Sequence, residues 1–215
     1  MKKFLLLIVL LAVCFLYTGT STALTYDFTT PEASILNGLS TGAVTITGIP
    51  LEIRAGLMLP ATGDFFLSHG GTFLSTGLEG LGVNDADDTL AIVSQVQADS
   101  IVPGLTESIV FNFDPLFTPE TITLARLFNG EDITIIADGI WFGDFEGSSD
   151  GTFTIPLPGK MSTLAITPPG ILSDDSDFYV LSIQGTVVPE PTTFALLGTG
   201  LLGLFGYGWQ RRQRI

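Results

Sequence analysis

The chain has 215 residues, of which 46% are hydrophobic, and its 22 acidic and eight basic side chains give a formal charge of −14 at pH 7. Such an excess of negative charge repels polyanions, so we exclude nucleic acid as a partner. The single cysteine, Cys14, cannot form a disulfide within the chain. The stability of the fold must therefore come from burial of apolar surface.

The N-terminus has the pattern of a secretory signal peptide. Residues 1–3 are positively charged, residues 4–16 form an apolar run, and Ser21 and Ala23 are small residues at the −3 and −1 positions of a cleavage site. We therefore predict a signal peptide over residues 1–23, cleaved after Ala23. The alternative is an uncleaved N-terminal transmembrane helix. Cys14 follows Val13, which does not suit a lipoprotein signal.

Residues 24–187 have the composition of an all-β domain. Thr, Val, Ile and Phe are frequent, Gly and Pro recur at short intervals, and no long stretch has the helical period. The expected strands are 43–47, 51–58, 64–67, 90–93, 107–113, 120–127, 132–137, 151–155, 162–167 and 178–187.

The clearest strand is 107–113, because its side chains alternate between two faces. Ile109, Phe111 and Phe113 share one face, while Ser108, Val110 and Asn112 share the other. Two dipeptides between strand-like runs, Asn129-Gly130 and Asp138-Gly139, predict two-residue hairpin turns, since both positions tolerate positive φ.

Many short strands without covering helices predict an antiparallel sandwich or barrel. We expect a jelly-roll-like antiparallel β-sandwich ectodomain. An immunoglobulin-like sandwich fits less well, because the Cys…Trp…Cys pattern is absent and Trp141 is the only tryptophan inside the domain.

Little in the domain points to catalysis. The only histidine, His69, lies in a turn-like Ser-His-Gly-Gly context, and no nucleophile elbow, zinc or phosphate-binding motif accompanies it. With so many acids, some carboxylates must lie close together, so their pairing alone does not indicate glycoside hydrolysis. We expect no enzymatic activity.

Two acidic clusters raise the possibility of calcium binding. Asp85, Asp87 and Asp88 form the first cluster and residues 173–177 the second. Calcium takes six to eight oxygen ligands, and aspartates two apart in a loop can point toward one ion. Neither cluster matches an EF-hand loop, and Asp also favours turns for local reasons. If either site binds calcium, we favour Asp85, Asp87 and Asp88; otherwise we expect no cofactor.

The last 28 residues, 188–215, have three parts in a fixed order. Val188, Pro189, Glu190 and Pro191 come first, an uncharged run at about 192–209 follows, and a basic tail (210–215) carries Arg211, Arg212 and Arg214. Eighteen helical residues span about 27 Å, close to the ~30 Å of a bilayer core. Arginines directly beyond an apolar helix mark its cytoplasmic end, so the run predicts a transmembrane anchor with the domain outside the cytoplasm.

This order resembles the PEP-CTERM sorting signal of exported proteins of Gram-negative bacteria and cyanobacteria. The resemblance implies that an exosortase, a membrane-embedded transpeptidase-like enzyme, recognises Pro189-Glu190-Pro191 and processes the chain. A plain C-terminal tail anchor is the alternative. More weakly, residues 80–83, 107–113 and 177–180 resemble the β-sandwich ectodomains that precede such signals.

The resemblance implies an exported protein, anchored in the cell-envelope membrane or released after processing. We expect a non-enzymatic structural or binding role in the envelope, biofilm or exopolysaccharide. The alternative is a carbohydrate-binding module or glycan hydrolase on a jelly-roll scaffold, with Trp141, Phe142, Phe145 and Tyr179 as an aromatic platform. A buried Trp141 favours the structural role, whereas an exposed ring beside acids favours sugar binding.

Overall fold

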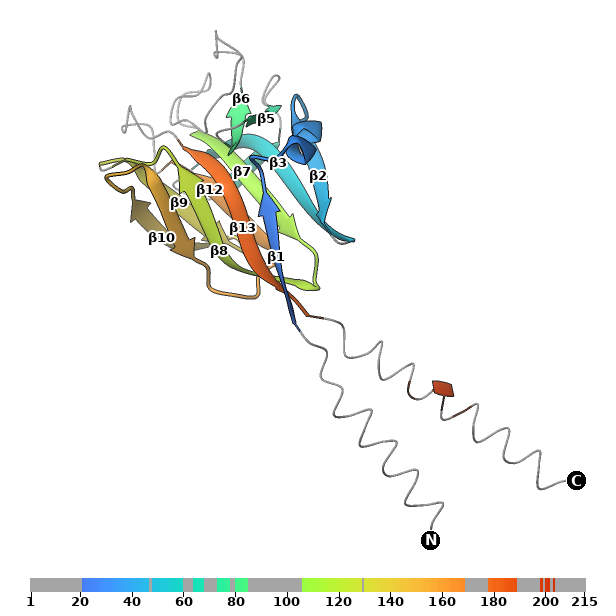
Figure 1. Cartoon of the computed structure of the whole chain (residues 1–215). Helices are drawn as coiled ribbons and strands as arrows, with labels where there is room; N and C mark the ends of the chain where they lie inside the picture. Colours follow the sequence, from blue (N-terminus) through green and yellow to red (C-terminus); the bar gives the residue numbers. More distant parts are fainter. Residues whose placement is uncertain are drawn as a thin grey trace, which may run out of the picture. The chain divides into compact units, whose positions relative to one another are not determined.

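The computed structural model describes residues 21–46, 48–59, 64–67, 73–77, 80–84, 106–128, 130–168 and 178–188, with Gly198, Gly200, Leu201 and Gly203. The chain divides into two units. One unit is Ala23–Thr186, and the other comprises Met1–Thr22 and Val187–Ile215. The first unit contains a β-sandwich (Figure 1).

The first layer, sheet A, brings together strands from both ends of the domain. Its path runs β11-β8-β13-β6-β5, and β1 pairs with β13. Its strands are β1 (Thr22–Asp27), β5 (Phe73–Gly77), β6 (Gly80–Asn84), β8 (Phe117–Ala125), β11 (Thr152–Pro156) and β13 (Tyr179–Val187).

The second layer, sheet B, has the path β10-β9-β12-β7-β3-β2, and β4 pairs with β3. Its strands are β2 (Thr41–Ile46), β3 (Ile49–Leu59), β4 (Asp64–Leu67), β7 (Thr106–Phe113), β9 (Asp132–Ala137), β10 (Ile140–Glu146) and β12 (Thr163–Thr167). A short 3-10 helix, η1 (Pro31–Leu36), connects β1 to β2 and buries Ala33 and Leu36. The strand pairs with a described register within each sheet are antiparallel.

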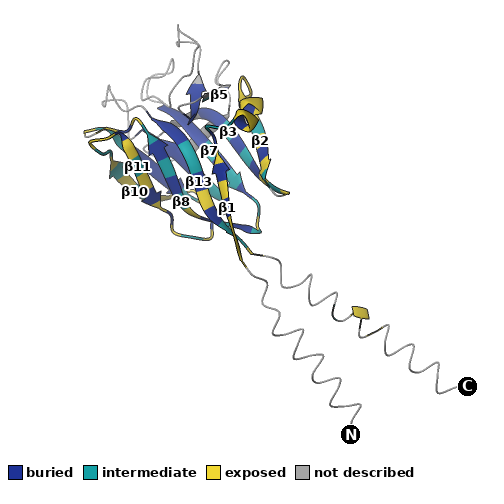
Figure 2. Cartoon of the chain, viewed as in Figure 1, coloured by how far each residue is buried: buried dark blue, intermediate teal, exposed yellow. Residues whose placement is uncertain are grey.

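The core lies between the two sheets, and the alternation along β7 explains why. Ile109, Phe111 and Phe113 are buried, and the ring of Phe111 packs 5.9 Å from that of Phe28, which follows β1. Val110 and Asn112, on the other face, are only half-buried. Figure 2 shows buried residues along the strands of both layers. The prediction of an antiparallel β-sandwich is confirmed.

The hairpin predicted at Asp138-Gly139 is also confirmed. β9 and β10 pair directly across it, with Ala137 opposite Ile140. Asp138 has φ 50° and Gly139 has φ 75°, the positive values that a type I′ turn requires at both central positions.

The hairpin predicted at Asn129-Gly130 is wrong. The preceding strand, β8, belongs to sheet A, and the following strand, β9, belongs to sheet B. Leu127 turns inward and is fully buried, and the carboxylate of Glu131 accepts a hydrogen bond from the backbone N–H of Phe128. The segment is therefore a connection between layers, which a turn-forming dipeptide cannot by itself distinguish from a hairpin.

Most of the other predicted strands are present with shifted ends. Strands 64–67 and 132–137 match β4 and β9, whereas predicted strand 120–127 starts earlier, at Phe117, and ends at Ala125. Predicted strand 90–93 lies outside the described residues. Four strands of the structure, β1, β5, β6 and β10, were not predicted from the sequence.

Tyr26 joins the two sheets at the end of the core. Its ring, on β1 of sheet A, is fully buried, and its hydroxyl donates a hydrogen bond to the carbonyl of Ile49 on β3 of sheet B, at 3.0 Å. Burial, with repulsion from Asp114 as a smaller cause, raises the pKa of Tyr26 to about 12 from an ordinary value of 10.0. The folded protein therefore favours the neutral phenol.

We expect Tyr26→Phe to reduce stability by about 1 kcal/mol near neutral pH, since it removes one hydrogen bond and keeps the ring. Because the folded pKa of Tyr26 is raised, this advantage of the wild type is complete below pH 10.0 and is lost as the pH rises through about 12. Urea unfolding of both proteins at several pH values measures the difference. A stability difference between wild type and Tyr26→Phe that stays constant up to about pH 12 would contradict the raised pKa of Tyr26.

Candidate functional site

The C-terminal segment begins where the sandwich ends. β13 finishes at Val187, and Val188 after it is exposed. Gly198, Gly200, Leu201 and Gly203, within the predicted transmembrane run, have helical conformation. Within the described part of the chain, no helix meets the length and hydropathy needed to cross a membrane.

Comparison with protein-family models finds one match here, at residues 187–212, to the PEP-CTERM protein-sorting motif. Residues 187–212 are a PEP-CTERM protein-sorting motif. The motif implies an exported protein that is sorted to the cell surface and processed by exosortase. Comparison with curated proteins finds no match to the chain.

The PEP-CTERM match at residues 187–212 covers the residues predicted to carry sorting except Arg214. Val188 is described and exposed, whereas Pro189, Glu190 and Pro191 lie outside the described residues, as do Arg211, Arg212 and Arg214. The roles of these residues remain predictions.

The predicted signal-peptide cleavage site lies at the start of β1. Ala23 is the second residue of this strand and is exposed, whereas Leu24 and Tyr26 after it are buried. Cleavage after Ala23 therefore leaves the buried part of β1 in the mature chain. The cleavage itself stays a prediction.

The predicted calcium ligands Asp85, Asp87 and Asp88 lie outside the described residues, as do the acidic cluster 173–177 and His69. Among the described residues, no group of three or more His, Cys, Asp or Glu side chains is placed to hold a metal ion. Calcium binding at the acidic loops stays a prediction.

Several described aspartates form turns. Each accepts a hydrogen bond from a backbone N–H; for Asp27, Asp114 and Asp150 the donor is two residues further on, as in Asx-type turns, whereas the donor to Asp138 is 24 residues away. The bonds run from Thr29 to Asp27, from Leu116 to Asp114, from Thr152 to Asp150 and from Ser162 to Asp138. Hydrogen bonds from Ser162, and further ones from Thr163, hold the pKa of Asp138 below its ordinary value. Turn formation thus explains part of the acidic content.

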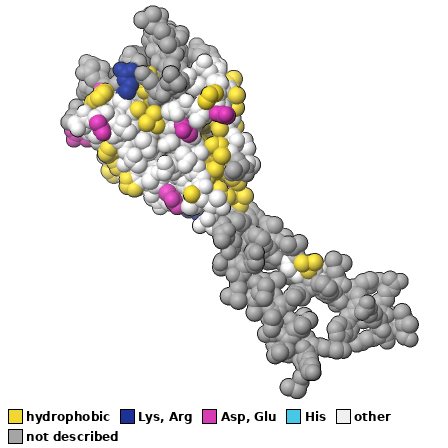
Figure 3. All heavy atoms as spheres, in the orientation of Figure 1, with side chains coloured by type: hydrophobic (Ala, Val, Ile, Leu, Met, Phe, Trp, Pro, Cys, Tyr) yellow, Lys and Arg dark blue, Asp and Glu magenta, His cyan; other side chains and the backbone are white. Residues whose placement is uncertain are grey.

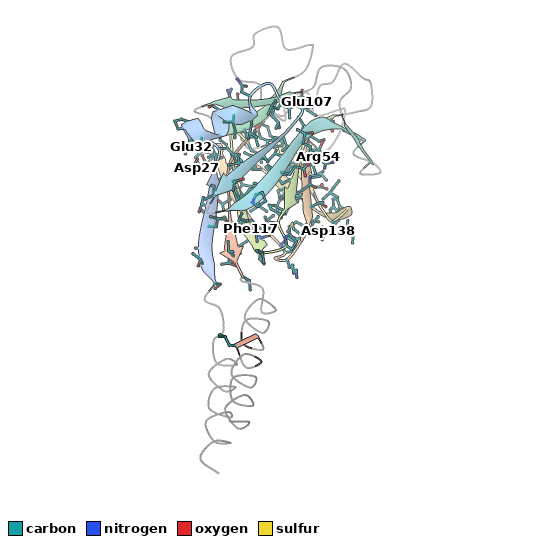
Figure 4. The ribbon with its side chains drawn as sticks, turned by 90° about the vertical axis from the view of Figure 1, so that its right-hand side faces the viewer. Asp27, Glu32, Arg54, Glu107, Phe117 and Asp138 are labelled. Atoms are coloured by element: carbon teal, nitrogen blue, oxygen red, sulfur yellow. The ribbon has the colours of Figure 1, made fainter. Side chains whose placement is uncertain are left out.

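A cluster of buried polar side chains lies where β7 begins, beside β12. Thr106, Glu107 and Ser108 are almost completely buried, as is Thr167 on β12. The hydroxyls of Thr106 and Thr167 are hydrogen-bonded to each other, and Thr167 also donates to the carbonyl of Glu107 at 3.1 Å. Glu107 and Asp138 lie toward opposite ends of the sandwich (Figure 4). The sequence placed Glu107 on a strand but contained no signal for its burial.

The structure removes one residue, Tyr179, from the proposed aromatic platform. Tyr179 is buried, with 2% of its surface exposed and the guanidinium carbon of Arg126 lying 6.0 Å from its ring centre, so it cannot contact a ligand at the surface. Phe142 and Phe145 are half-buried, with ring centres 5.9 Å apart. Trp141 is 63% exposed.

Trp141 is held in a defined orientation on the edge strand of sheet B. β10 is the last strand on the path of sheet B, and a β-bulge between Trp141 and Gly143 makes Phe142 an extra residue in the ladder. The indole Nε1 of Trp141 donates to Oδ1 of Asp144 at 3.2 Å. The same oxygen accepts a 2.6 Å hydrogen bond from the hydroxyl of Thr134 on β9.

The strand register shows which face of the sheet carries Trp141. Residues opposite each other in paired strands share a face. One row across four neighbouring strands consists of Trp141, Ile136, Ala165 and Val110. This row lies on the outer face of sheet B, because the neighbouring residue in β9, Ile135, points into the core. Ile136 and Ala165, with Val110 packed against them, form a small apolar cluster behind Trp141 on this face.

Proposed function

We propose that the chain is an exported β-sandwich protein with a non-enzymatic structural or binding role in the cell envelope, biofilm or exopolysaccharide. One observation carries this proposal. The sorting motif starts at Val187, the final residue of the final strand, so the thirteen described strands end before Pro189-Glu190-Pro191. Processing at Pro189-Glu190-Pro191 then releases or transfers a complete domain.

The charge of the domain fits a position outside the cell, in contact with water. Residues 24–187 contain 21 acidic and three basic side chains, a formal charge of −18. Figure 3 shows separate acidic side chains over the visible face. Such a surface favours solubility and disfavours association with polyanions. The jelly-roll-like form of the sandwich is part of the same proposal.

The runner-up is a carbohydrate-active protein. Trp141 is exposed and lies beside Asp144. This arrangement favours sugar binding, whereas a purely structural role would favour a buried ring. The described residues supply no comparable observation in favour of hydrolysis. We therefore propose binding without catalysis.

The intact mass of the protein from the envelope and from the medium of its native host tests the sorting proposal. We expect a C-terminus near residues 188–191. The variant Glu190→Ala should accumulate with its C-terminus at Ile215, because it alters the recognition motif. A matched exposed glutamate, Glu32 on η1, serves as the control, and Glu32→Ala should be processed like the wild type. A wild-type protein ending at Ile215 in the membrane fraction would contradict processing and support a plain tail anchor.

A further inference from the structure

We propose that Trp141 and Asp144, on the outer face of β10, bind a neutral polysaccharide whose pyranose rings present a flat C–H face. This inference deepens the proposed role at the cell surface and rests on it. The pair is called the Trp141–Asp144 platform below. The ligand class follows from the exposure of the ring, the carboxylate acceptor beside it and the charge of the domain.

The ring of Trp141 is oriented before any ligand binds. Its Nε1–H is bonded to Asp144, and Asp144 is held in turn by Thr134 on the neighbouring strand. A β-bulge changes the direction in which neighbouring side chains point, and bulges are common at sheet edges. The bulge beside Trp141 lies on such an edge strand. An aromatic ring that is fixed in advance loses little side-chain entropy when a ligand stacks on it. The large exposed ring is therefore suited to binding an apolar surface.

Asp144 supplies the polar part of the platform. Both of its hydrogen bonds within the described structure end on Oδ1. Oδ2 is thus available to accept a hydrogen bond from a ligand. A carboxylate next to an exposed indole matches a sugar, which carries hydroxyl donors at the rim of an apolar ring face. A purely apolar ligand could not donate a hydrogen bond to this oxygen.

The charge of the domain determines which polymer fits. The formal charge of −18 over residues 24–187 repels anionic polysaccharides and nucleic acid. It also opposes pairing with a second copy of the chain. The edge of β10 is further protected against strand addition by its bulge and by the charged residues Asp144 and Glu146. A neutral polysaccharide avoids each of these penalties.

Affinity electrophoresis tests the proposal with the full chain. The protein is purified in a detergent without a sugar headgroup and run in native gels containing soluble mixed-linkage β-glucan, xylan or the polyanion alginate. We expect retardation by β-glucan or xylan and none by alginate. Trp141→Ala should weaken retention about tenfold, corresponding to about 1.4 kcal/mol. Asp144→Asn should also weaken it, because the amide oxygen takes over the bonds from Trp141 and Thr134 and the amide NH₂ then replaces Oδ2, which can no longer accept a hydrogen bond from a sugar hydroxyl.

Ile140→Ala is the matched control, because Ile140 is the neighbour of Trp141 and is 73% exposed, but lies on the opposite face in the alternation of the strand. It should leave retention unchanged. Fluorescence of Trp141 in a Trp209→Phe background reports binding directly, since these are the two tryptophans of the chain. Unfolding midpoints establish that the variants are folded.

Three results would overturn the inference. The first is that β-glucan and xylan do not retain the wild type. The second is that Trp141→Ala is retained as strongly as the wild type. The third is a change in oligomeric mass that depends on Trp141 and occurs without glycan binding. The last result would identify a second copy as the occupant. The C-terminus of each variant, measured by intact mass, separates failure of this inference from failure of sorting, because substitutions at the platform do not alter the motif at 187–212.

Discussion

Phe117→Ala is expected to lower the free energy of unfolding by about 3–5 kcal/mol, a large part of the ~5–15 kcal/mol that stabilises a typical domain. Phe117, on β8 of sheet A, is 1% exposed and lies between the sheets (Figure 4). Its ring meets Tyr26 edge-on, with centres 5.2 Å apart, and packs 5.7 Å from Phe113 on β7 of sheet B. Truncation therefore removes contacts within one sheet and across to the other.

Urea unfolding of the full chain, followed by circular dichroism, measures the loss. Phe128→Ala is the matched control, because Phe128 is 46% exposed and loses less buried surface. We expect its effect to stay below about 1.5 kcal/mol. Equal effects of the two substitutions would show that the rings between the sheets do not determine stability.

Gly185→Ala is the second substitution with a large expected effect, about 3 kcal/mol or more. A Cβ atom at Gly185, on β13, would lie 2.2 Å from the backbone oxygen of Thr118 and 2.6 Å from the ring of Phe117. The Phe117 ring can move slightly, but the oxygen of Thr118 belongs to the backbone of β8, the strand next to β13 in sheet A. Relief therefore requires the two strands to separate locally.

The unfolding midpoint of Gly185→Ala checks this prediction. Gly143→Ala on β10 is the control, because among the described residues a Cβ there would meet only the ring of Phe145, at 3.2 Å, and the end of a side chain can shift. We expect a change within about 1 kcal/mol for the control. A midpoint for Gly185→Ala equal to that of the wild type would show that β8 and β13 are further apart than the structure places them.

The sequence predicted local features of the fold with good accuracy. The alternation of Ile109, Phe111 and Phe113 identified the inward face of β7, and Asp138-Gly139 identified a hairpin turn. Both features depend on residues within a few positions of one another. The assignment of strands to sheets was not predictable in this way, because β1 pairs with β13 at the other end of the domain. The wrong hairpin at Asn129-Gly130 has the same cause, since turn chemistry does not specify which strands pair.

In the candidate site, too, the sequence predicted local features but not those that depend on strand pairing. Trp141 and Tyr179 were both proposed as surface aromatics, and both lie on strands. Tyr179, on the central strand β13 of sheet A, is buried, whereas Trp141, on the edge strand β10 of sheet B, is exposed. Nothing in the sequence near either residue distinguishes these positions. The hydrogen bonds that join Trp141, Asp144 and Thr134 also depend on pairing between strands.

The sequence by itself determined that the chain carries a PEP-CTERM sorting motif and that the domain before it is built from strands. Sorting signals and strand periodicity are linear patterns, so the order of residues contains them completely. Only the tertiary structure decided which aromatic ring is exposed and which acid stands beside it. Burial depends on which strands pair and which sheets stack, and these contacts join residues far apart in the chain.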